Sequence, residues 1–180
     1  MDDFNIKIEY KHVPRFDSGS DESIDYLERE GYVIIKNALT ANEASKTLDL
    51  LWDYLENLGT GIDRTNPMTW SDDKWPTCAH GGIIPSYGIG HSEAQWFVRG
   101  VPNVKKAFAK VWGTNDLLTS FDGVSLWRPW NIDPSWKTQS GQAWFHIDQH
   151  PISKPGKQCI QGLINLLPTS KEIGGNVVIP

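Results

Sequence analysis

The hydrophobic pattern of the chain changes near residue 113, and this change constrains the fold more than any other feature of the sequence. Before it, apolar residues recur at helical spacing between clear start and stop signals. The helices expected from these signals are Asp21 to Glu30, stopped by Gly31; the Thr40–Glu43 capping box to Gly59; the Ser92–Gln95 box to Gly100; and Pro102 to Gly113. Beyond Gly113, apolar and β-branched runs of strand length predominate. Helices followed by strands predict an α+β domain, with helices flanking an antiparallel sheet.

The expected strands lie mainly in the second half of the chain. They are residues 32–35, 117–121, 124–128, the stretch around 143–149, 158–167 and 176–179. Asp122-Gly123, between two of them, is either a hairpin turn or a bulge. Residues 60–91 contain many Gly, Pro, Trp and Asp residues and have no sustained period. Their aromatic content argues against disorder, so we expect an ordered flap that shapes substrate choice.

Composition narrows the class of protein. The chain has 180 residues and a formal net charge of -5, and its 17 Lys and Arg are scattered, so we expect no nucleic-acid partner. No apolar run approaches membrane-spanning length, and the acidic N-terminus does not resemble a signal peptide. Cys78 and Cys159 match no zinc spacing and are expected to be free thiols. We therefore expect a cytoplasmic protein without a membrane partner, with a flexible arm over residues 1–20 and one domain over residues 21–180.

One short stretch carries the chemistry. In an extended strand, side chains two residues apart point to the same side, so His146 and Asp148 can present an imidazole and a carboxylate to one point, with Trp144 on the same face. These are two of the three ligands of a 2-His-1-carboxylate iron site. The spacing alone is weak evidence, because a histidine and an aspartate two residues apart also occur by chance.

Four segments, which follow one another in the same order as in a known family, carry a resemblance to that family. They are Glu30–Asn37 with the capped helix behind it, Asp116–Arg128, Trp144–Gln149, and Gln161–Leu166 leading to Gly174–Pro180. Together they resemble the phytanoyl-CoA dioxygenase family of iron(II)- and 2-oxoglutarate-dependent oxygenases. The resemblance implies a double-stranded β-helix, a cupin-like jelly roll of two antiparallel sheets with helices outside. Fewer strands are expected here than a jelly roll needs, so we expect N-terminal helices packed on an incomplete jelly roll.

The resemblance also implies a site. His146 and Asp148 match the family's first two iron ligands, and Arg128 and Gln161 lie where the family places contacts to 2-oxoglutarate. A salt bridge for Arg128 and a strand-surface position for Gln161 are equally open, and Gln149 is expected to point away from the metal. The family's second histidine ligand and its 2-oxoglutarate arginine lie beyond the segment that matches Gly174–Pro180. The chain is thus expected to be an N-terminal portion of such an enzyme.

The third ligand therefore stays open. His150, His80 and His91 are candidates, although loop positions without a metal are favoured for each, and His12 lies in the arm. The implied activity is hydroxylation of a small molecule coupled to oxidative decarboxylation of 2-oxoglutarate, and aspartate as the second ligand favours hydroxylation over halogenation. The alternatives are an inactive jelly-roll binding module and an inactive fragment. The substrate and the oligomeric state are not readable from the residues.

Overall fold

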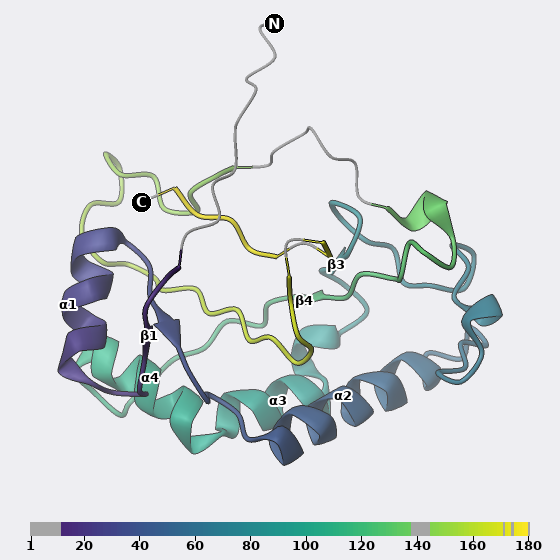
Figure 1. Ribbon diagram of the computed structural model, residues 1–180, viewed down its shortest axis with the longest axis horizontal. Helices are drawn as coiled ribbons and strands as arrows, with labels where there is room; N and C mark the ends of the chain where they lie inside the picture. Colours follow the sequence, from purple (N-terminus) through teal and green to yellow (C-terminus); the bar gives the residue numbers. More distant parts are fainter. Residues whose placement is uncertain (1–11, 138–144, 171, 174, 180) are drawn as a thin grey trace, which may run out of the picture.

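A computed structural model describes residues 12–137, 145–170, 172–173 and 175–179 of the chain. Its helices are α1 (Asp21–Glu30), α2 (Ala41–Glu56), α3 (Glu93–Gly100) and α4 (Pro102–Trp112), with short 3₁₀ turns at Pro67–Thr69, Ile89–His91 and Pro134–Trp136. Figure 1 shows α2, α3 and α4 along one edge of the molecule, α1 at one end, and the rest of the described chain above them. Among the described residues no helix is both long and apolar enough to pass through a membrane.

The four predicted helices are confirmed, and local side-chain bonds explain where they begin. Ser20 caps α1 by accepting from the amide of Ser23, and Gly31 ends that helix in the left-handed conformation. The Thr40–Glu43 box at the start of α2 is complete, with both reciprocal bonds present. The second box is half-formed, because Ser92 caps α3 while the Gln95 side chain donates to the carbonyl of Gly123 instead.

Strand pairing is limited to two short pairs in the described part of the chain. β1 (Arg15–Phe16) runs parallel to β2 (Ile34–Ile35), and β3 (Ile83–Ile84) runs antiparallel to β4 (Val124–Ser125). Residues 12–20 are therefore tied into the domain, in contrast to the predicted arm over residues 1–20, whose residues 1–11 lie outside the described part. Two further contacts hold this segment, since Asp17 pairs with Lys36 at 3.1 Å and the Ser18 hydroxyl donates to the Asn103 carbonyl at 2.5 Å.

Among the described residues of the second half, most of the predicted strands do not form paired strands. β4 does not pair with residues 117–121 in a hairpin; it pairs with β3 from the first half, and the glycine at 123 lets the chain pass close to the carbonyl of Ile84. Described residues of 145–149, 158–167 and 176–179 form no assigned strand. Many apolar side chains in these runs are exposed, Ile147, Leu163 and Ile179 among them. The incomplete jelly roll itself stays a prediction, because nothing in the two strand pairs tests closure of a larger sheet.

Buried apolar side chains lie along α2, α3 and α4, with Leu51, Val98 and Val104 among them. One cluster of the core joins α2, β3 and the segments beside them. Its buried residues are Leu55, Ile62, Trp75, Ile84 and Ile89, and Trp52 and Trp70 pack against them with ring centroids 5.0 Å apart. Four of these five buried residues come from residues 60–91. That segment is ordered, as predicted, and it contributes most of this buried cluster, while its expected role in substrate choice stays a prediction.

Candidate functional site

The structure brings His146, Asp148 and Gln161 together. His146 Nε2 lies 3.4 Å from Asp148 Oδ1, and the Gln161 side-chain amide donates to the other oxygen, Asp148 Oδ2. The two side chains of the His-x-Asp pair are 44% and 45% exposed, so both donor atoms are reachable from solvent. The two side chains approach each other as the sequence predicted, but residues 148 and 149 lie in a bend and residues 145–149 form no assigned strand, so strand parity is not what brings them together. Trp144, expected on the same face, lies outside the described residues.

The distance between the two donor atoms suits a shared metal ion. Two ligand atoms about 2.1 Å from one divalent metal, at right angles, are about 3 Å apart. An imidazole nitrogen and a carboxylate oxygen are also the donor types of the iron site in 2-His-1-carboxylate oxygenases. The pair at 3.4 Å thus fits two adjacent coordination positions after a small movement. A third His, Cys, Asp or Glu does not join them within the described part of the chain.

The Gln149 side chain organises the loop that follows the His-x-Asp pair. Gln149 Nε2 donates to the carbonyls of Lys154, at 2.5 Å, and Gly156, while its Oε1 accepts from the amide of Gln158 at 3.1 Å. Gln149 is therefore turned into the loop, in agreement with the expectation that it does not face a metal. This loop closure sets residues 158–161 beside the His-x-Asp segment.

His150 has a structural contact of its own. Its Nδ1 accepts from the amides of Ile152 and Ser153, at 3.3 and 3.2 Å, which ties the imidazole to the turn after Pro151. One ring nitrogen of His150 is thereby engaged by the backbone, which supports the loop position over the role of third ligand. His91 also has a packing role, because its ring stacks on Phe121 with centroids 3.9 Å apart and lies near Trp96.

Two further contacts fix the Gln161 segment to the helices. Lys157 pairs with Glu28 of α1 at 2.5 Å. Gly162 packs so closely on α4 that a Cβ there would come within 2.7 Å of Phe108 Cζ. Residues on either side of Gln161 are thus held by α1 and α4, and the amide between these anchors faces Asp148.

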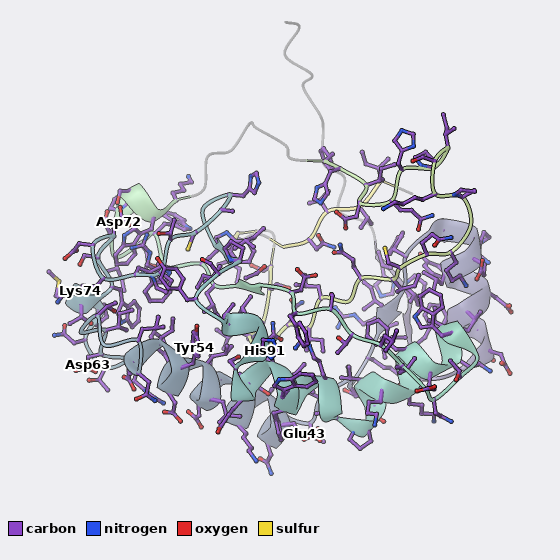
Figure 2. The ribbon with its side chains drawn as sticks, turned by 180° about the vertical axis from the view of Figure 1, so that it is seen from behind. Glu43, Tyr54, Asp63, Asp72, Lys74 and His91 are labelled. Atoms are coloured by element: carbon purple, nitrogen blue, oxygen red, sulfur yellow. The ribbon has the colours of Figure 1, made fainter. Side chains whose placement is uncertain are left out.

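Arg128 lies in a different environment. Its guanidinium donates to the Trp70 carbonyl at 2.6 Å, pairs with Asp72 at 2.5 Å, and lies over the rings of Trp75 and Trp136 at 5.5 and 4.6 Å. Figure 2 shows Asp72 at one end of the molecule, and α1, which holds Lys157, is at the other end (Figures 1 and 2). These contacts are the salt-bridge alternative that the sequence left open, and a contact between Arg128 and 2-oxoglutarate stays a prediction.

The sequence placed Gln161 on a strand expected to flank the His-x-Asp strand, but it did not indicate the hydrogen bond to Asp148. Parity within one strand relates residues 146 and 148, but nothing local relates Asp148 to a residue 13 positions downstream. The loop-closing role of Gln149 was missed for the same reason. A glycine beside a glutamine, here Gly162, was the available hint that the backbone approaches another element at this position.

Comparison with known proteins gives two relatives. The chain is 35% identical over 169 residues to a protein named Ava biosynthesis cluster protein O from Aspergillus versicolor, a match that covers 94% of this chain and 52% of the relative. It is 28% identical over 137 residues to a Dictyostelium discoideum protein named "Putative phytanoyl-CoA dioxygenase", covering 73% of this chain and 38% of that relative. The chain thus spans about half the length of these relatives, or less. No family model and no solved structure matches it.

Proposed function

We propose that this chain is part of an Fe(II)- and 2-oxoglutarate-dependent oxygenase of the phytanoyl-CoA dioxygenase type, which hydroxylates a small molecule. The observation that carries the proposal is the 3.4 Å approach of His146 Nε2 to Asp148 Oδ1, with both groups open to solvent. The likeness to the Dictyostelium protein supports the same class of reaction.

In this proposal His146 and Asp148 hold the metal and leave other coordination positions open. His146 contributes the neutral lone pair of Nε2, and Asp148 contributes a full negative charge through Oδ1, which offsets part of the charge of a divalent ion. Bound Fe(II) supplies the activation of molecular oxygen that amino-acid side chains alone do not provide. The Gln161 amide donates to the other oxygen of the same carboxylate, Oδ2.

The test is a metal titration of the full chain with matched histidine variants. Calorimetric titration with Mn(II) under anaerobic conditions should show one site, and His146→Ala or Asp148→Asn should weaken it about 100-fold or more, since lost outer-sphere partners alone cost 10–100-fold. His150→Ala is the control, because that imidazole is tied to its own turn through Nδ1. Release of succinate from 2-oxoglutarate, with Fe(II) and oxygen, should follow the same order.

The result also decides between the oxygenase and a binding module without turnover. A folded chain that takes up no Mn(II), or one whose affinity is unchanged in His146→Ala, would contradict the oxygenase proposal and support the module. Alanine variants of His80 and His91 extend the series. A loss of affinity in one of them would identify it as a further ligand.

A further inference from the structure

We propose that Gln161 is a positioning residue that makes Asp148 bind a metal through one oxygen only. The inference rests on the proposed function and assigns a new role to a residue for which the sequence suggested contact with 2-oxoglutarate. Its basis is the arrangement of the two carboxylate oxygens. Oδ1 faces His146 Nε2, whereas Oδ2 accepts from the Gln161 amide.

The carboxylate needs such a partner because its own torsion does not define its orientation. Rotation of an aspartate carboxylate about χ2 is broad, so the backbone at Asp148 does not decide which oxygen faces His146. A carboxylate can also chelate a metal with both oxygens, as it often does around larger cations. A donor fixed on Oδ2 competes with chelation and keeps one coordination position available. A facial site that binds 2-oxoglutarate and oxygen needs these positions open.

Gln161 is suited to this task because its backbone is anchored on both sides. Lys157 is held by Glu28 of α1, and Gly162 packs against Phe108 of α4. In addition, Gln149 binds the amide of Gln158 and so joins the two segments that carry Asp148 and Gln161. With its backbone placed from both sides, Gln161 keeps its amide within reach of Asp148 Oδ2 and so favours one orientation of the carboxylate.

The experiment compares Gln161→Leu with Gln158→Leu in the full chain, using Co(II) as the probe. Co(II) suits this because it binds nitrogen and oxygen sites somewhat more tightly than Fe(II) and has visible d–d bands that report coordination. Gln158 is the matched control, since its side-chain amide donates to the nearby carbonyl of Pro155 and, among the described residues, not to Asp148. We expect Gln161→Leu to weaken Co(II) binding about 10-fold, the lower end for outer-sphere partners, because Asp148 is half-exposed and water partly replaces the amide.

Two further readouts separate positioning from a general loss of structure. The d–d spectrum of Gln161→Leu should differ from that of the wild type, and the affinity of the Co(II) complex for 2-oxoglutarate should fall, while the thermal midpoint stays unchanged. Gln161→Asn, whose amide is one methylene shorter, should give an intermediate affinity. Gln158→Leu should match the wild type in every readout.

The outcomes distinguish this inference from the proposed function. If the wild type binds Co(II) through His146 but Gln161→Leu leaves affinity and spectrum unchanged, the positioning role is overturned and the oxygenase proposal stands. If Gln161→Leu loses affinity for 2-oxoglutarate but keeps the wild-type Co(II) affinity and spectrum, the positioning role is also overturned. That result would indicate that Gln161 contacts 2-oxoglutarate directly. If the wild-type chain binds no Co(II), the proposed function fails and this inference fails with it.

Discussion

Replacing Arg128 should destabilise the domain without weakening the metal site. The Arg128 side chain is 13% exposed, and its guanidinium donates to the Trp70 carbonyl and lies over the Trp75 and Trp136 rings. Arg128→Met keeps much of the packing volume but removes a charged hydrogen bond, worth about 1.5–3 kcal/mol, and two cation–π contacts of about 0.5–1 kcal/mol each. We therefore expect a loss of about 3 kcal/mol in the free energy of unfolding.

The contribution of Asp72 to this value is small. Its side chain is 80% exposed, so the ion pair with Arg128 is screened by water and adds at most a few tenths of a kcal/mol. Asp72→Asn should accordingly change the free energy of unfolding by less than about 0.5 kcal/mol. Arg128→Lys keeps the charge but loses the planar group that stacks between two rings, so we expect a loss of about 1–2 kcal/mol.

Urea unfolding followed by tryptophan fluorescence measures these losses, because the rings of Trp75 and Trp136 lie against the substituted side chain. The same proteins are titrated with Mn(II) and then with 2-oxoglutarate under folding conditions. The reasoning is refuted if Arg128→Met unfolds within 0.5 kcal/mol of the wild type. Normal stability combined with lost 2-oxoglutarate binding would instead favour the cosubstrate role that the family resemblance implies.

Three further substitutions test local features of the fold. Gly162→Val should destabilise the domain by about 1–3 kcal/mol in urea, because its side chain would overlap the Phe108 ring; a loss under 0.5 kcal/mol would argue against that close packing. Thr40→Ala should cost about 1 kcal/mol in the same assay, since it removes the side-chain cap of α2. Arg64, donating to Glu56, holds the pKa of that carboxyl below its usual value of 4.5, so the folded state binds fewer protons than the unfolded state. Stability should therefore fall as pH is lowered below about 4.5, and the fall should be smaller in Glu56→Gln.

The helices could be predicted from the sequence because their signals are local. Ser20, Thr40 and Ser92 lie within one turn of the amides that they cap, and Gly31 and Gly113 end helices through their own backbone conformation. Each signal needs only neighbouring residues. The Ser92 cap formed as predicted because it needs only the amide of Gln95. The reciprocal bond of the capping box did not form, because the Gln95 side chain donates instead to the carbonyl of Gly123, which is distant in sequence.

Strand partners and the core could not be predicted in the same way. Val124 pairs with Ile84, forty positions away, and no local pattern favours this partner over residues 117–121. Residues 60–91 have no regular spacing of apolar residues, because they pack as irregular backbone around tryptophans. Buried segments are recognised in a sequence by that regular spacing, so the contribution of this segment to the core could not be predicted. The contacts of Arg128 with Trp70, Trp75 and Trp136 could not be predicted either, because these residues are distant from it or separated by irregular loop in the sequence and come together only in the folded state.

The site and the core depend on separate sets of contacts, and this separation predicts how variants should behave. The His-x-Asp segment is held by Gln149 and His150 within its own loop and by the pairing of Lys157 with α1. The buried cluster around Trp75 is instead built by residues of α2 and β3, with residues of β4 packed against it. Substitutions at Asp148 or Gln161 should thus change metal binding with little change in unfolding, and substitutions in the core should do the reverse. A core variant that loses metal affinity while still folded would show that the two regions are coupled through contacts beyond those named above.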